Sequence, residues 1–430
     1  MLLNPAAIAQ TEDQANNFIQ QFYGRPIIPE CDENKTSGCV RHLREKKTCV
    51  ECNLKNTNLS KTQINNADLR KADLKDANFE FVILQNAKLD EAKLENTKLT
   101  GANLKKAKLP KAKIINADLT DTVLEESVLK SADLSKSNFT NSNLKNADVS
   151  FATANNVVML NADLSEANLE ESSFTESDLK NAVFNRSFAF KTNFSNSDLR
   201  SSRFILSSLI GAQFTGSKLQ FSDFENAKLV SANFAGANLT RTNFLNASLE
   251  KVVFRDAILR GANLKGTNLD QADFSNANLS EINLEGANLK NAQFDGAILR
   301  GANLAGANLE GANLEGGKMT GANLEGANLK NANLQQASLI GVNFKKADLE
   351  NTDLTRADPR QASFIGAKLI GANFKNARLG GVNFSFSDLT EASFFSAYID
   401  KAVFNQAVLN NTVWIDGQIC NPKSIGTCRQ

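Results

Sequence analysis

The sequence has very few of the side chains that most catalytic and metal sites use. Its 430 residues include one His, one Trp and two Tyr. The single imidazole, His42, lies ahead of residue 54, so no Ser-His-Asp or Cys-His arrangement can form in the long stretch after it. No run approaches the roughly 18 apolar residues of a transmembrane helix. The 48 basic and 47 acidic residues leave a net charge of +1, which excludes an overall basic footprint for nucleic acid.

A five-residue repeat fills most of the chain. From residue 54 to residue 414, a large apolar residue, usually Leu or Phe, stands at nearly every number ending in 4 or 9. We call these positions centres. Residues 304–313, for example, read Leu-Ala-Gly-Ala-Asn-Leu-Glu-Gly-Ala-Asn. A fixed period over such a length predicts a solenoid, in which no unit is stable alone and each coil packs on its neighbours.

The unit predicts one inward pair and one corner. In extended backbone, residues two apart face the same way, so the centre and the small residue two before it both point inward. Ala67, Ser137 and Thr242 are typical of the small position. The two remaining residues turn the corner, and 18 of the 24 glycines stand at the second residue after a centre. That bias predicts a positive φ at this corner position.

The spacing of Phe predicts an even number of sides per coil. Phe174 to Phe254 recur every ten residues, with Leu at most centres between them, and the pattern returns from Phe364 to Phe404. Four sides per coil would give opposite walls of stacked Phe and stacked Leu.

These repeats resemble the pentapeptide-repeat family, whose motif is Ala, then Asp or Asn, then Leu, then two variable residues. The resemblance implies an all-β solenoid, a right-handed quadrilateral β-helix. Four units per turn imply about 18 coils, which at the roughly 4.8 Å spacing of neighbouring strands would form a rod on the order of 85 Å long. The Cys-x-x-Cys directly before the first repeat and the tail beginning Trp414-Ile415-Asp416-Gly417, followed by two cysteines, resemble exported members of cyanobacteria. This second resemblance implies a location in the periplasm or the thylakoid lumen. Most such relatives have no assigned biochemical activity.

Four segments are expected. Residues 1–9 end in a small-x-small pattern and are interpreted as the remnant of an export signal whose start lies upstream of Met1. Residues 10–48 are predicted to form a helical cap, with helices at Thr11–Phe22 and Cys39–Lys47. Residues 49–414 form the β-helix as a single elongated domain, and residues 415–430 form a capping tail.

The cysteines lie outside the bulk of the repeats, which predicts disulfides in an oxidising compartment. Cys420 with Cys428 would close a short loop in the tail. At the front, three pairings of four cysteines stay open. Cys49 and Cys52 continue the inward positions of the repeat register, which favours a structural role; a redox pair and a four-Cys zinc site are weaker alternatives. The disulfide candidates are Cys31, Cys39, Cys49, Cys52, Cys420 and Cys428.

Outward apolar residues are the main clue to function. Phe190, Ile210 and Val230 are spaced by 20 and would form one column in a four-sided coil. An exposed apolar patch of this kind often marks a contact surface. The predicted interaction patch comprises Phe188, Phe190, Leu206, Ile210, Phe221 and Val230.

Charge and irregular centres predict further local features. A 20-residue coil would stack Lys88 over Lys108 and Lys93 over Lys113, next to an acidic band from Asp118 to Asp178. Adjacent bands of opposite sign could steer a partner or a second copy.

The weak centres Val149, Ala154 and Met159 predict a distorted coil. Pro359, also a centre, predicts a lost ladder hydrogen bond or a bulge.

The sequence therefore predicts a non-enzymatic scaffold that presents the faces of a rigid β-helix to a protein partner outside the cytoplasm. No catalytic residue, cofactor, metal, nucleic-acid partner or membrane span is expected, and self-association is an alternative to a foreign partner. Another alternative is a DNA-mimic protector of a topoisomerase, although the family members of that kind are strongly acidic and dimeric. The last alternative is a redox-responsive cap acting through Cys49 and Cys52.

Overall fold

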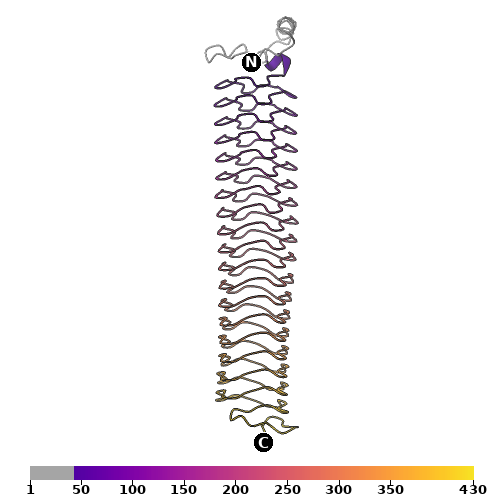
Figure 1. The fold of residues 1–430 in the computed structure, drawn as a ribbon, viewed down its shortest axis with the longest axis vertical. Helices are drawn as coiled ribbons and strands as arrows, with labels where there is room; N and C mark the ends of the chain where they lie inside the picture. Colours follow the sequence, from indigo (N-terminus) through magenta and orange to yellow (C-terminus); the bar gives the residue numbers. More distant parts are fainter. Residues whose placement is uncertain (1–42) are drawn as a thin grey trace. The chain divides into compact units, whose positions relative to one another are not determined.

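The computed structural model describes residues 43–430. They fall into two compact units, which meet in the sequence between Ser208 and Leu209. Both units have the same local architecture (Figure 1). The repeat register itself continues through Ser208 and Leu209 without insertion or deletion, so nothing in the sequence signals this division. The predicted helix Thr11–Phe22, the export-signal remnant, Cys31 and Cys39 lie outside the described residues.

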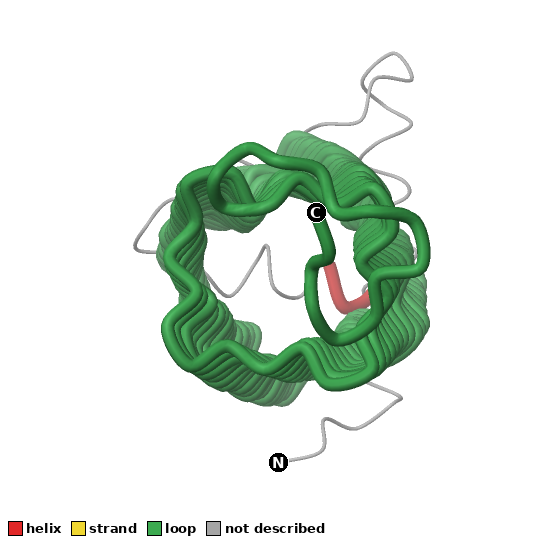
Figure 2. The backbone as a smooth tube through the Cα atoms, turned by 90° about the horizontal axis from the view of Figure 1, so that it is seen from below, coloured by secondary structure: helices red, strands yellow, loops and turns green. Residues whose placement is uncertain are grey.

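The units are built from coils of four sides. Each side contributes a single bridged residue, so Figure 2 draws the coils as loops. The bridges are parallel and join residues 20 apart, as in Asn53 with Asp73 and Asn303 with Asn323. Four five-residue repeats therefore complete one coil, and the predicted even-sided coil is confirmed. The stacked lysine pairs are confirmed too, with bridges from Lys88 to Lys108 and from Lys93 to Lys113.

Leu and Phe fill the interior of the coils. Apart from Pro359, which is also buried, centres from Leu54 to Phe394 are at most 2% exposed, and the small residues two before them are buried as well. The Phe period appears as stacked rings, with 4.6 Å between the centroids of Phe184 and Phe204 in the first unit and 4.7 Å for Phe214 and Phe234 in the second. Alternation of large and small inward residues packs each layer against the next.

Most corners are tight turns closed by a hydrogen bond from the amide of the small residue to the carbonyl of the preceding centre; at Ala117, Val157 and Ser177 the amide donates to a serine hydroxyl of the next coil instead. The Ala307 amide, for example, donates to the Leu304 carbonyl at 3.0 Å. The second corner residue has positive φ whether it is Gly306 (64°), Asn291 (56°) or Lys106 (60°). The prediction from the glycine bias is confirmed, and many other residue types accept the same left-handed conformation here.

Asparagine side chains reinforce the outer surface of the second unit. The Asn303 side-chain oxygen accepts from the Ala305 amide at 3.3 Å and from the Asn323 amide group at 3.2 Å. The same column continues at Asn343, whose amide group donates to Asn323 at 2.9 Å. These ladders satisfy polar groups along the stack and explain why Asn is common two residues before a corner.

The weak centres do not distort the first unit, contrary to the prediction. The amides of Val149, Ala154 and Met159 all donate to the following coil at 2.7 Å. A smaller centre leaves the backbone ladder intact because the ladder depends on peptide groups and not on side-chain volume.

Proline at a centre has the expected local effect. Pro359 has no amide hydrogen to donate, and Asp358 and Arg378 are not joined by a bridge, although both belong to the described residues. The corner bond from Ala362 to the Pro359 carbonyl, at 2.9 Å, is kept. The coil therefore loses one ladder bond and forms no bulge.

The two ends of the described chain carry different covers. An α-helix spans residues 43–46 before the first coil (Figure 1), and Leu43 in it is fully buried. The first bridged residue is Thr48, which pairs with Asp68. At the other end the tail crosses the mouth of the last coil (Figure 2). Among the described residues, no helix has the length and apolarity that a bilayer span requires.

Candidate functional site: exposed apolar and cysteine-stapled surfaces

One side of the first unit carries three exposed apolar residues, which we call the apolar side patch. Phe188 is 62% exposed, Phe190 38% and Leu206 52%. The bridge from Phe188 to Ser208 brings two neighbouring coils together there, and Leu206 lies two residues before Ser208. The patch therefore spans two coils of one side. Exposed apolar groups of this size are typical of contact surfaces.

A groove of about 410 Å³ borders the apolar side patch at the corner where Leu206 lies. Leu206 has a φ of 60°, a conformation that is unfavourable for a bulky side chain. Arg186 and Arg203 line the same groove and have no carboxylate partner in the described part of the chain. The residues that line the groove are Lys145, Asn146, Ser165, Glu166, Asn185, Arg186, Arg203, Ile205 and Leu206.

Charge around the groove is partly compensated. Lys145 contacts the Asp163 carboxylate at 3.2 Å. Burial raises the pKa of Asp163, but hydrogen bonds from Ser165 and the ion pair with Lys145 outweigh burial and hold that pKa below its usual value. On the far edge of the patch, the Lys191 ammonium lies 4.9 Å from the centroid of the Phe190 ring, within cation–π range. Cationic side chains therefore lie at both edges of the apolar side patch, with the carboxylates of Glu166 and Glu171 beside them.

The structure places the other predicted patch residues in the second unit. Ile210 and Val230 are half-buried and lie on one corner column, where the Gly211 amide donates to the Val230 carbonyl at 3.0 Å. Phe221 is 58% exposed but occupies a different corner, half a coil away in the register. Within this unit the three residues therefore do not form one patch.

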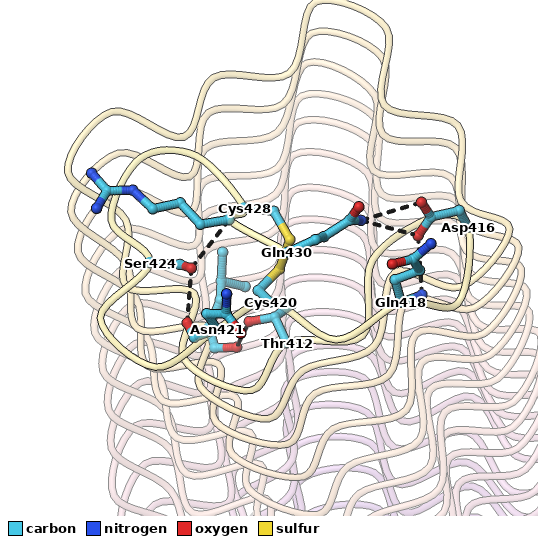
Figure 3. The surroundings of a disulfide bond; sticks show 10 residues. Thr412, Asp416, Gln418, Cys420, Asn421, Ser424, Cys428 and Gln430 are labelled. Atoms are coloured by element: carbon cyan, nitrogen blue, oxygen red, sulfur yellow. Dashed lines mark hydrogen bonds between the residues drawn. A yellow bond between two sulfur atoms is a disulfide. The ribbon is translucent and has the colours of Figure 1, made fainter.

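The described cysteines form two disulfides. Cys49 pairs with Cys52, and both are almost fully buried at inward positions of the first coil, as the register predicted. Cys420 pairs with Cys428 in the tail (Figure 3). The burial of Cys49 and Cys52 favours the structural interpretation over a redox pair, because a thiol partner could not reach either sulfur. Residues 43–430 contain no cluster of three or more His, Cys, Asp or Glu suited to a metal.

Some exposed aromatic residues were missed by the sequence analysis. Phe81 is 53% exposed and lies over Gly101, where an added Cβ would come within 2.5 Å of its ring. Phe386 is 63% and Tyr398 60% exposed. The repeat register places Phe81, Phe386 and Tyr398 at outward positions, so the sequence could have predicted their exposure. The sequence alone does not show which of these residues lies in the last coil, where the stack of coils ends.

The comparisons with known proteins agree with this architecture. The family model described as pentapeptide repeats (8 copies) matches residues 52–90, 87–125, 122–159, 162–204, 207–244, 237–276, 277–316, 318–356, 343–381 and 360–394. No curated protein matches the chain.

Several solved structures are similar to parts of the chain. The chain is 30% identical to HetL, a pentapeptide repeat protein involved in heterocyst differentiation regulation from the cyanobacterium Nostoc sp. strain PCC 7120, over 52% of this chain and 91% of that one, with a TM-score of 0.36. A pentapeptide repeat protein of the Arabidopsis thaliana thylakoid lumen is 26% identical over 28% of this chain and 70% of that one, with a TM-score of 0.21. Rfr23 of the cyanobacterium Cyanothece 51142 is 24% identical over 35% of this chain and 99% of that one, also with a TM-score of 0.21.

The family matches extend across most of the chain and follow the five-residue register seen in the coils. The fold of this family is the right-handed quadrilateral β-helix, in agreement with the four-sided coils and parallel bridges. The chain belongs to the pentapeptide repeat family.

Proposed function

We propose that this protein is a non-enzymatic scaffold that binds a protein partner through the side faces of its β-helix. The observation that carries this proposal is the apolar side patch of Phe188, Phe190 and Leu206. The backbones of Phe188 and Phe190 are fixed by ladder hydrogen bonds: the Phe188 amide donates to the Ala167 carbonyl, and the Glu171 amide donates to the Phe190 carbonyl, both at 2.9 Å. A partner would therefore meet preordered apolar groups, and little conformational entropy would be lost on binding.

The interior supports a binding function and not catalysis. In both units Leu and Phe fill the space inside the coils. Acidic side chains stand at outward positions and are engaged by neighbours, as in the ion pair of Asp198 with Arg200 at 2.6 Å. An enclosed substrate pocket with a paired general acid and base has no place in such a coil.

We further propose a location outside the cytoplasm, in the periplasm or the thylakoid lumen. The pairs Cys49–Cys52 and Cys420–Cys428 support it, because disulfides persist in oxidising compartments. The net charge of +1 weighs against the alternative of a DNA mimic that protects a topoisomerase, since a mimic must reproduce a dense negative charge.

We also propose that residues 10–48 cap the first coil and that the chain forms about 18 coils at roughly 4.8 Å each. The full burial of Leu43 in the helix at 43–46 supports the cap. A cap is needed because the first coil otherwise presents an open sheet edge.

Proximity labelling in the native compartment tests the function. The variant Phe188→Ser with Leu206→Ser removes the two most exposed residues of the apolar side patch without touching a buried residue. Phe81→Ser is a matched control, because Phe81 is also exposed (53%) in the same unit, on a corner column that holds no residue of the patch. We expect the double variant to lose specifically labelled partners that the control keeps.

Two results would contradict the proposal. One is an unchanged set of labelled proteins, together with unchanged self-association, in the double variant. The other is recovery of the chain from the cytosol in complex with a topoisomerase, which would favour the mimic.

A further inference from the structure

The last coil of the second unit is covered on only two of its four sides. In the coil before it, each side donates to the next coil, as where the Leu379 amide donates to the Tyr398 carbonyl and the Phe384 amide to the Val403 carbonyl, both at 2.7 Å. The sides that contain Tyr398 and Val403 have no such successor among residues 43–430. Their open backbone groups are the amides of Ile399, Lys401 and Phe404 and the carbonyls of Ala397 and Ala402.

The tail covers the other two sides as an added strand. Antiparallel bridges join Val408 to Ile425 and Val413 to Ile419. The disulfide between Cys420 and Cys428 closes the tail over the mouth of the coil (Figures 2 and 3). The tail therefore adds one strand next to the sides that contain Val408 and Val413. The sides that contain Tyr398 and Val403 have no strand next to them at this end, and we call these two sides the open shelf.

The open shelf is apolar as well as unpaired. Tyr398 is 60% and Val403 45% exposed, and the centres Ile399 and Phe404 are only half-buried, whereas centres of earlier coils are fully buried. Uncovered amides and carbonyls next to apolar side chains are a template for a further strand. The shelf thus offers both backbone pairing and apolar contact.

A cavity of about 370 Å³ opens at the corner of the same shelf. Gly380 and Gly381 form its floor, because neither has a side chain to fill the corner, and Arg360 and Tyr398 flank it. Lys401 and Asp400 lie on the shelf side of the cavity, so a polar side chain of an occupant would meet both charges there.

We propose that the open shelf binds an extended segment of a partner polypeptide, which adds the missing strand along the sides of Tyr398 and Val403. The tail shows that this end of the β-helix accepts an added strand. Because the tail extends beyond the open shelf by one strand, one further strand can lie beside the tail on the shelf. The partner segment would place two large apolar side chains five residues apart, over Ile399 and Phe404, and would donate amides to Ala397 and Ala402. This site is separate from the apolar side patch.

A synthetic peptide tests the proposal on the full-length protein. The probe is a fluorescein-labelled decapeptide with the sequence of residues 397–406, Ala-Tyr-Ile-Asp-Lys-Ala-Val-Phe-Asn-Gln, which presents the required spacing. The control peptide is N-methylated at its Tyr and Val, which removes the two amides that would reach Ala397 and Ala402 and keeps every side chain. We expect saturable binding of the probe by fluorescence anisotropy and loss of binding with the control.

Matched variants separate backbone pairing from side-chain contact. Ile399→Pro removes the open amide, and Pro359, two coils earlier in the same column, shows that a centre in this column tolerates proline. Ile399→Ala keeps the amide and removes the side chain. We expect Ile399→Pro to bind the probe about three- to tenfold more weakly than Ile399→Ala, as for the loss of one hydrogen bond.

Hydrogen exchange gives an independent result. The amides of Ile399, Lys401 and Phe404 should exchange quickly in the free protein and slowly with the probe bound, while the Leu409 amide, which donates to Ser424 at 2.9 Å, should not change. Equal binding of the N-methylated control would overturn the proposal, as would the absence of saturable binding. Self-association of the protein alone that Ile399→Pro abolishes would also overturn it, because a second copy would then occupy the shelf.

Discussion

Truncation of Phe234 gives the most direct test of the coil interior. Phe234 is fully buried, and its ring lies 4.7 Å from Phe214 and 5.2 Å from Phe254 in stacked geometry. It also meets Phe224 and Phe244 edge to face, each at 5.9 Å between centroids. Core Phe→Ala changes cost about 3–5 kcal/mol. Since aromatic pairs each add about 0.5–1.5 kcal/mol beyond area burial, we expect Phe234→Ala to fall in the upper half of that range.

The assay is urea unfolding followed by far-ultraviolet circular dichroism, with hydrogen exchange to locate the change. Because each coil packs mainly on its neighbours, protection should fall first in the coils that contain Phe214 and Phe254. Phe234→Leu is the matched control: Leu is the usual residue at the other centres, so this change should cost less than about 1.5 kcal/mol. Glu225→Ala, at an outward corner, should stay within about 0.5 kcal/mol of the parent. Equal losses for Phe234→Ala and Glu225→Ala would refute the inward and outward assignment.

Further predictions concern the corners, the tail and an ion pair. Gly101→Ala should destabilise the protein by about 1 kcal/mol more than Gly236→Ala. The two glycines have nearly the same φ (64° and 65°), but only at Gly101 would the new Cβ meet the Phe81 ring. Thermal melts measure the difference, and Phe81→Ala should remove it. The double variant Cys420→Ser with Cys428→Ser should destabilise the folded tail by about 2–3 kcal/mol, because the disulfide no longer constrains the loop. The amides of Leu409 and Trp414, which donate to the tail, should then show faster hydrogen exchange. Unchanged hydrogen exchange would contradict the capping role of the tail. The Arg70 side chain, which donates to the Asp68 carboxylate, holds the pKa of Asp68 below its usual value. The stability that this pair contributes is present above the ordinary Asp pKa of about 3.9 and is lost as pH falls through the lowered pKa of the folded state. Asp68→Asn should therefore be less stable than the parent at neutral pH, with the gap closing in acid; a gap that persists at about pH 2 would contradict this account.

Much of the fold could be read from the sequence because the repeat is a local rule applied many times. Inward and outward positions follow from side-chain alternation, and the glycine bias at Gly306 and its equivalents follows from the backbone conformation of a tight corner. The ten-residue recurrence of Phe indicated an even number of sides, and the bridges between residues 20 apart agree with it and give four. The distorted coil predicted at Ala154 was wrong, since the backbone ladder tolerates a small centre.

The candidate sites depended on longer-range arrangement. The register gave Phe188, Phe190 and Leu206 as outward residues, but only the stacking of coils shows that they share one side of the first unit. The pairing of Cys49 with Cys52 could not be chosen among the alternatives from spacing alone, because it depends on which inward positions of one coil come within bonding distance.

The amino-acid sequence alone is sufficient to predict the structure of a coil, since every five residues carry the same inward pair and the same corner. Each coil contacts only its neighbours, so its structure does not depend on residues far away in the sequence. The ends of a solenoid have no such rule. Whether the tail after Trp414 would cover all four sides of the last coil or only two is decided in three dimensions, by the path that the Cys420–Cys428 bond and the antiparallel bridges impose. For that reason the open shelf at Tyr398 and Val403, whose residues look like any other repeat in the sequence, becomes visible only in the folded chain.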